Sequence, residues 1–266
     1  MAKKPTSTEL RTWDQDLADA AVAASAKASK SAGGGRIFGT KGGILSIDGS
    51  VIPGNSVDVI VLEYIAVNAK YPKYDPASPS GPSCFAFEPE DSDAAMVPDA
   101  GAAHPENEDC LTCPMNAFGS DEVTGKGKAC KNLRRLAVIS CGNTLNGRTT
   151  FFKPDELAKQ PLAFMHVNPT SGKLWDGFVK QISNVQHRPP FGVRIRISLR
   201  RHETNQFEFV FDFIDNVPND FREVIMQRVE EARREIRFPF APFAERPAAP
   251  ARGAARPVAA AKRSKY

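Results

Sequence analysis

Four of the five cysteines lie in one stretch of the chain, with the spacing Cys84-x25-Cys110-x2-Cys113-x16-Cys130. Cys110 and Cys113 form a C-x-x-C pair, which can place two thiolates on one metal ion. The two flanking cysteines would complete a tetrahedral site of four thiolates. Thiolates are soft ligands that suit Zn²⁺, an ion without redox chemistry. The spacing therefore predicts a structural zinc ion held by Cys84, Cys110, Cys113 and Cys130.

Two other kinds of metal site use similar residues. Four cysteines also hold iron–sulfur clusters, so such a cluster is an alternative to zinc. The segment from His104 to Glu106, followed by Cys110, is similar to the H-x-E…P-C-x-x-C signature of zinc deaminases. It departs from that signature because Asp109 rather than proline precedes Cys110, and because only three residues separate Glu106 from Cys110. His104 is then either a surface residue or a substitute ligand for Cys84.

Charge is unevenly placed along the chain. There are 35 Lys and Arg residues against 31 Asp and Glu residues, so the formal net charge is only +4. Eight acidic residues and no Lys or Arg lie between Glu88 and Asp109. Positive residues cluster instead around Cys130: Lys126, Lys128, Lys131, Arg134 and Arg135. This cluster could offset the charge of a four-thiolate site or present a surface for phosphates, and the two roles are compatible.

A second basic feature is an expected β-hairpin. Apolar and polar residues alternate from Val193 to Arg200 and again from Gln206 to Phe213, which predicts two strands with one buried and one solvated face. The solvated face of the first strand carries Arg194, Arg196 and Arg200. Glu208 and Asp212 are expected to pair with some of these arginines across the hairpin. The remaining positive charge makes this face a candidate track for a phosphate backbone.

Aromatic residues in the expected loops are candidates for stacking on bases. Tyr71 and Tyr74 lie in a proline-rich loop, and Phe118 follows the C-x-x-C pair. Trp175 and Phe178 lie at helical spacing and are expected in the core. Cys141, at the end of a mostly apolar run, is expected to be a buried thiol.

The remaining pattern predicts a mixed fold. Strands are expected from Val57 to Val67, with both faces largely buried, and from Pro161 to Val167. On the first of these, Val59, Val61, Glu63 and Ile65 are expected on one face and Ile60, Leu62, Tyr64 and Ala66 on the other. Asp48-Gly49 predicts a tight turn. Two helices complete the expected elements. The first is capped by Thr170 or Ser171, and the second follows Pro218 and reaches Ile236.

Composition divides the chain into three parts. Residues 1–35 are expected to form an alanine-rich helix and a Gly joint, and residues 36–238 one core domain with the cysteine segment 84–130 inserted. Residues 239–266 are expected to be a disordered Pro/Ala tail. The tail is basic, with Arg246, Arg252, Arg256, Lys262, Arg263 and Lys265. We expect an α+β fold: a β-rich, OB-like barrel with a four-cysteine zinc loop and flanking helices.

Several short sequences resemble one family of proteins. They are Pro82-Ser-Cys-Phe-Ala86, Cys110-Leu-Thr-Cys-Pro-Met-Asn-Ala-Phe-Gly-Ser120, Gly127-Lys-Ala-Cys-Lys131 and Arg134-Arg-Leu136. These sequences resemble a zinc-containing single-stranded DNA-binding protein family of tailed bacteriophages, over about Gly43 to Phe213. The resemblance implies a role among replication genes. The basic tail is a departure, because many bacterial and phage single-strand binders recruit partners through an acidic tail.

Together these features predict a sequence-independent single-stranded DNA-binding protein of phage DNA replication and recombination. It would carry structural Zn²⁺, act in the cytoplasm of an infected bacterial host, and have single-stranded DNA and phage replication proteins as partners. No apolar run approaches the ~18 residues of a membrane span, so no membrane contact is expected. Catalysis is not expected, because no residue set forms a nucleophile–base pair or a two-metal site. A zinc-containing protein-interaction adaptor and a nuclease remain the alternatives, and the oligomeric state stays open.

Overall fold

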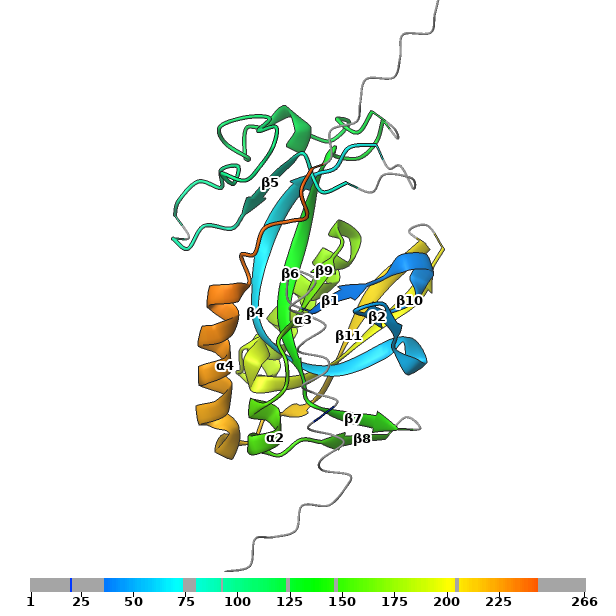
Figure 1. Cartoon of the computed structure of the whole chain (residues 1–266), viewed down its shortest axis with the longest axis vertical. Helices are drawn as coiled ribbons and strands as arrows, with labels where there is room; N and C mark the ends of the chain where they lie inside the picture. The colour runs from blue at the N-terminus through cyan, green and yellow to red at the C-terminus, as the bar shows by residue number, and fades with distance from the viewer. Residues whose placement is uncertain are drawn as a thin grey trace, which may run out of the picture.

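The computed structural model of the protein describes Ala20 and residues 36–73, 80–91, 93–122, 125–145, 148–203 and 206–243. These residues form an α+β fold dominated by a curled, half-barrel sheet with few helices (Figure 1). Three predictions fall on residues outside this description. They are the N-terminal helix and Gly joint (residues 1–35, apart from Ala20), the role of Tyr74, and the tail from residue 244 to residue 266. Within the described residues, no helix is both long and apolar enough to cross a membrane.

The described strands form one nine-stranded sheet and one separate hairpin. The strand order of the large sheet is β11 (Gln206–Asn216), β10 (Val193–His202), β4 (Ser56–Lys70), β6 (Cys130–Ser140), β9 (Ala163–Val167), β1 (Arg36–Gly39), β2 (Ser46–Ile47) and β3 (Ser50–Val51), with β5 (Cys84–Phe87) also paired to β4. The hairpin consists of β7 (Gly142–Leu145) and β8 (Arg148–Phe151). All pairings are antiparallel except that of β1 with β9, which is parallel.

The described residues contain few α-helices. Short segments of 3-10 helix occur in the connections between the other elements. The α-helices are α2 (Pro154–Ala158), α3 (Pro169–Gln186) and α4 (Arg222–Glu235), and the 3-10 segments are η1 (Lys41–Gly43), η2 (Pro53–Asn55), η3 (Pro114–Asn116), η4 (Pro190–Gly192) and η5 (Asn219–Phe221). The cap of α3 differs from the prediction, because Asn168 Oδ1 accepts the bond from the Ser171 backbone nitrogen at 2.8 Å. Ser171 Oγ instead accepts a bond from the backbone of Phe209, which fastens α3 to β11.

Strand β4, the longest of the described strands, curves from beside β10 up to β5 and so connects the two parts of the sheet (Figure 1). Its first residues, Ser56–Val59, pair with β10, and its last residues, Val67–Lys70, pair with β5. Strand β6 follows its other edge along almost the whole length. The two ends of the sheet therefore belong to one continuous pair of long strands.

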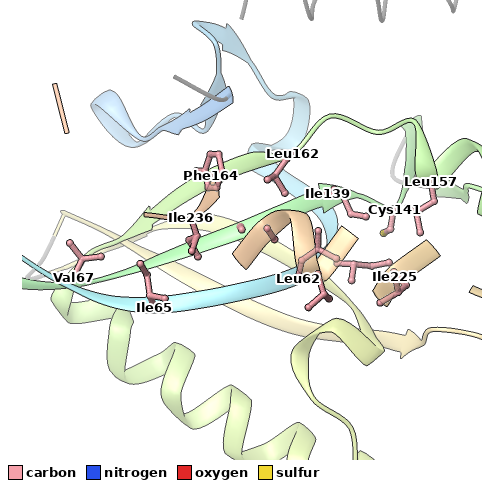
Figure 2. Close-up of a cluster of buried hydrophobic side chains, with 14 of the residues drawn as sticks. Leu62, Ile65, Val67, Ile139, Cys141, Leu157, Leu162, Phe164, Ile225 and Ile236 are labelled. Atoms are coloured by element: carbon pink, nitrogen blue, oxygen red, sulfur yellow. The ribbon is translucent and has the colours of Figure 1, made fainter. Parts of the chain in front are cut away.

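The register of β4 changes at Leu62, where a bulge lies between Val61 and Glu63. A bulge inserts one residue and so exchanges the two faces of the strand beyond it. Ile65 consequently shares a buried cluster with Ile60 and Leu62 (Figure 2). The regular alternation predicted from the sequence, with Ile65 on the face of Val59 and Val61, is therefore wrong beyond the bulge.

Each face of the sheet is covered by one amphipathic helix. Helix α4 buries Ile225 and Val229 against one face, within the cluster that contains Leu62 and Cys141 (Figure 2). Helix α3 buries Trp175 and other side chains against the opposite face. Trp175 has no exposed surface, and Cys141 is also buried, which confirms both predictions. Each large apolar side chain buried in this way stabilises the fold by roughly 1.5–3 kcal/mol.

After α4 the chain continues as an ordered segment, residues 236–243, which we call the C-terminal strap. It follows β4 toward β5 (Figure 1). The ring of Phe240 lies 5.2 Å from that of Phe85, and Gly81 donates a backbone hydrogen bond to Pro242. The prediction that disorder begins at residue 239 is therefore wrong for residues 239–243, because the strap packs its aromatic side chains on the sheet.

Candidate functional site

The sheet brings two of the four cysteines together. Lys70, the last residue of β4, pairs with Cys84 on β5 at one edge and with Cys130 on β6 at the other. Residues directly opposite one another in neighbouring strands project from the same face. The side chains of Cys84, Lys70 and Cys130 therefore stand in one row across three strands.

The C-x-x-C pair completes a ring of cysteines at this end of the sheet. Cys84, Cys110, Cys113 and Cys130 all line one cavity of about 10 Å³, together with Lys70 and other residues. That volume has room for about one sphere of the size of a water molecule. Among the described residues, however, no three His, Cys, Asp or Glu side chains stand as a metal-binding group. The ring thus has the donor chemistry and the space for one ion, without a ligating arrangement of the sulfur atoms.

Burial and mutual repulsion both disfavour the thiolate form of Cys84, Cys110 and Cys130. Burial raises the pKa of Cys130 to about 12, and charge on Cys110, Cys84 and Cys113 acts in the same direction. Burial likewise raises the pKa of Cys84 and of Cys110, again with contributions from neighbouring cysteines. Four thiolates would repel one another here, and a cation between them would reverse that effect.

The segment between the strands has almost no core of its own. We call residues 88–129 the cysteine loop, and its described residues contain only one 3-10 segment, η3. Cys110 is the only buried residue among them. Too little apolar surface is buried to hold such a segment by packing, and small units of this kind are commonly held by a metal.

Polar contacts attach the cysteine loop to the sheet. Asn132 Nδ2 on β6 donates to Asn68 Oδ1 on β4 at 2.5 Å and to Asn116 Oδ1 of the loop at 3.2 Å. Lys128 Nζ donates to the amide oxygens of Asn116 and Asn132. Sequence reasoning missed this network because its asparagines are far apart in the chain, and only the register of β4 and β6 brings them together.

Most of the predicted basic cluster near Cys130 is engaged within the protein. Lys131 Nζ lies 3.0 Å from Asp121 Oδ2. Arg134 donates two hydrogen bonds to the carboxylate of Asp176, at 3.1 and 2.9 Å. Lys126 is exposed at the tip of the loop. Among these residues Lys126 and Lys128 lie in the loop itself, while Lys131 and Arg134 follow Cys130 on β6.

Arg135 is fully buried, which corrects its predicted place on a DNA-binding surface. Its guanidinium lies 4.8, 4.0 and 4.8 Å from the ring centres of Phe87, Phe238 and Phe240. It donates to the backbone oxygens of Ile236 and Phe238 at 2.9 and 2.6 Å. Burial lowers the pKa of Arg135 to about 10, so it remains charged at neutral pH. Arg135 fastens the C-terminal strap to the sheet.

The arginines of the hairpin are also engaged, and they lie far from Cys84, Cys110, Cys113 and Cys130. Arg194 is only 6% exposed and pairs with Asp215 at 3.0 Å, which corrects the prediction that its side chain is solvated. Its guanidinium is covered by the ring of Phe151, at 4.2 Å. Arg196 and Arg200 pair at 2.7 Å with acidic residues, the first with Asp58 and the second with Glu208. The Glu208 pairing confirms one predicted partner, whereas Asp58 and Asp215 were not predicted.

The predicted basic residues therefore do not form one track. Strand β10 pairs with β4 as far as Val59, whereas the cysteine ring lies at Lys70. Eleven residues of strand separate the two places, or about 36 Å along β4. The structure leaves two separate positively charged regions in place of a continuous surface.

The two most exposed large apolar side chains among the described residues lie on the cysteine loop. Phe118 is 83% exposed, and Lys128 Nζ lies 5.2 Å from the centre of its ring. Leu111, inside the C-x-x-C pair, is 86% exposed and was not predicted as a functional residue. Tyr71 is 42% exposed and lies edge-on to Phe240, with 6.4 Å between ring centres. Only the structure shows that Leu111 projects into solvent, because an isolated leucine gives no such signal in the sequence.

No protein-family model, curated protein or solved structure matches this chain. The function is therefore inferred from the geometry of the cysteine loop and from the resemblance of its sequence. The most specific part of that resemblance, the cysteine motifs, lies in or next to the cysteine loop.

Proposed function

We propose that the protein binds single-stranded DNA without sequence preference, in phage DNA replication and recombination. The observation that carries this proposal is the exposed ring of Phe118 beside the amine of Lys128. An exposed aromatic ring can stack on any base, and a neighbouring amine can neutralise a phosphate. In this proposal the curled sheet serves as an OB-like body that carries the cysteine loop.

The same proposal assigns a structural Zn²⁺ to Cys84, Cys110, Cys113 and Cys130. Four cysteines line one cavity, and the loop that they hold has no other buried residue among those described. We propose zinc in preference to an iron–sulfur cluster because thiolates are soft ligands that suit Zn²⁺ in closed structural sites. The zinc would fix the position of Phe118 relative to the sheet, and the thiolates would be its ligands.

The basic tail joins the molecule at this end as well. Phe243, the last described residue of the strap, lies edge-on to His104 of the cysteine loop, with 5.1 Å between ring centres. Beyond it the sequence continues with six Lys and Arg residues and one Glu. Positive charge attached here would attract a phosphate backbone toward Phe118, and the attraction would weaken with salt.

The experiment that tests this proposal is a titration of labelled single-stranded and duplex oligonucleotides at several salt concentrations. We expect single strands to bind more tightly. Phe118→Ala should weaken that binding by about 1–3 kcal/mol at every salt concentration, because a stacked base is lost. Phe118→Trp should retain the affinity. Leu111→Ala is the matched control, since Leu111 is equally exposed on the same loop but has no ring.

A protein-interaction adaptor is the second candidate, and the exposure of Leu111 favours it. An adaptor would use Leu111 and Phe118 together as an apolar contact. Equal tolerance of Phe118→Ala and Leu111→Ala in the DNA titration, or a preference for duplex, would reject the single-strand proposal in favour of this one. DNA cleavage that depends on Mg²⁺ and on acidic residues would favour the nuclease alternative instead.

A further inference from the structure

A pocket with unpaired arginines lies at the end of the molecule opposite the cysteine loop. We call it the arginine pocket. Its volume is about 210 Å³, and Arg188, Phe191, Val217, Arg222, Ile225 and Met226 contribute to its lining. It lies where α4 begins, far from β5 and the cysteine loop along the long axis of the molecule (Figure 1). The pocket therefore belongs to no part of the proposed DNA site.

The arginine pocket combines an apolar floor with uncompensated positive charge. No Asp or Glu lines it. Among the described residues, the guanidinium of Arg222 has no hydrogen bond or ion pair, and that of Arg188 donates only to the backbone oxygen of Val217, at 3.4 Å. Met226 is 42% exposed at the rim. Such a site fits a negatively charged segment that also presents an apolar side chain.

The chain itself contains a segment with these properties. Residues 88–109 carry eight carboxylates and no Lys or Arg. Several pair within the protein, but Asp93 and Glu108 are exposed and form no ion pair among the described residues. Val97 lies between them and is 52% exposed. This acidic segment and the arginine pocket are at opposite ends of the molecule (Figure 1).

We propose that the acidic segment of one molecule docks on the arginine pocket of a second copy, with Val97 as the apolar contact. The two surfaces differ from each other, so the contact is head-to-tail and does not close into a symmetric dimer. Repeated head-to-tail contacts produce open chains of molecules. Charge complementarity between the two surfaces selects this occupant, because no Asp or Glu lines the pocket and no Lys or Arg lies within residues 88–109.

The contact involves one small pocket, so the association is weak and dominated by charge. Interfaces well below about 1,200 Å² are typical of transient complexes. Attraction between exposed charges is screened at ionic strengths near and above 0.15 M, where the Debye length is about 8 Å. Self-association should therefore increase with protein concentration and decrease with salt.

The test is sedimentation velocity of the full chain without nucleic acid, so that its outcome is independent of the proposed DNA binding. The wild-type protein should show a weight-average mass above that of one chain, rising with concentration at low salt. Arg222→Glu should abolish this rise, and so should the pair Asp93→Lys with Val97→Lys. Lys180→Glu is the matched control, because Lys180 is exposed on α3 and lines neither the arginine pocket nor the surface beside the acidic segment.

A mixture of the two defective variants gives the sharpest result. Arg222→Glu keeps an intact acidic segment, and the Asp93→Lys, Val97→Lys variant keeps an intact pocket. Each should remain monomeric alone, whereas the mixture should form a 1:1 dimer and nothing larger. A wild-type protein that stays monomeric at all concentrations overturns the proposal. Self-association that survives Arg222→Glu but not the acidic-segment changes also overturns it, because another basic surface would then be the partner.

Discussion

The two ends of β4 are stabilised by different forces. From Ser56 to about Val67 the strand is held between α3 and α4, and its apolar side chains are buried on both faces. Beyond Val67 the sheet carries the cysteine loop, in which Cys110 is the only buried residue among those described. One end is stabilised by packing on both faces, whereas the cysteine loop at the other end is attached by polar contacts and, in our proposal, by a zinc ion.

The packed region supplies the stability of the fold, whereas in our proposal the cysteine loop carries the function. The packed region has the large apolar burial that makes a fold cooperative. The cysteine loop exposes Phe118 and Leu111, which would be unfavourable in a region that had to build a core. A metal would allow the loop to be rigid without burying the side chains that, in our proposal, contact DNA. The comparison therefore predicts that the two regions can be disturbed separately.

The largest expected effect is the loss of the metal. Cys130→Ser should reduce the zinc content from about one ion per chain to nearly none, since one of four ligands is removed. Hydrogen exchange should then become fast in residues 88–129 and stay slow in β10 and α3, because the packed region does not depend on the ion. Elemental analysis and hydrogen exchange measure the two effects.

Cys141→Ser is the matched control for that experiment. Cys141 is buried in the packed cluster, so this change should lower the free energy of unfolding by about 1–3 kcal/mol and leave the zinc content unchanged. Unchanged zinc content in Cys130→Ser, or fast exchange throughout the sheet, would show that the two regions are not held in different ways.

The second effect concerns the connection between the regions. Arg135→Ala should lower the free energy of unfolding by about 3–5 kcal/mol, because it leaves a cavity and removes the donor to the backbone oxygens of the strap. Proteolysis within residues 236–243 should increase. Arg134→Ala, one residue away, should change stability by about 1 kcal/mol or less, because its ion pair with Asp176 is partly exposed. Equal effects of the two changes in urea unfolding would contradict the assigned role of Arg135.

Local sequence signals predicted the elements whose conformation depends on local chemistry. The Asp48-Gly49 turn connects β2 to β3, and both residues have positive φ. The alternating pattern predicted the β10–β11 hairpin, and the helical spacing predicted the burial of Trp175. The four cysteines that were singled out by their spacing all line one cavity, and the zinc site predicted for them stays a prediction.

The predictions that were wrong concern features that depend on tertiary structure, such as side-chain burial and strand register. The bulge at Leu62 exchanges the faces of β4, and nothing in the apolar run marks its position. Arg194 and Arg135 were expected at the surface because arginine usually is, but aromatic rings from distant segments cover both. The buried partner of Arg196, Asp58, lies on another strand that only the sheet order brings alongside. A cluster of charged residues in the sequence therefore does not by itself show where the folded protein has a charged surface.

The smallest expected effect is a pH dependence at the same connection. His166 Nε2 accepts a hydrogen bond from Arg135 Nε at 3.0 Å, which requires a neutral imidazole. Burial and the nearby charge of Arg135 lower the pKa of His166 to about 4. The unfolded chain binds this proton near pH 6.5, so stability should fall as the pH drops from about 6.5 to 4, by about 3 kcal/mol, and level off below. His166→Gln keeps an acceptor for Arg135 but cannot titrate, so this part of the pH dependence should disappear from urea unfolding. An unchanged dependence in the variant would show that Arg135 holds the strap without His166.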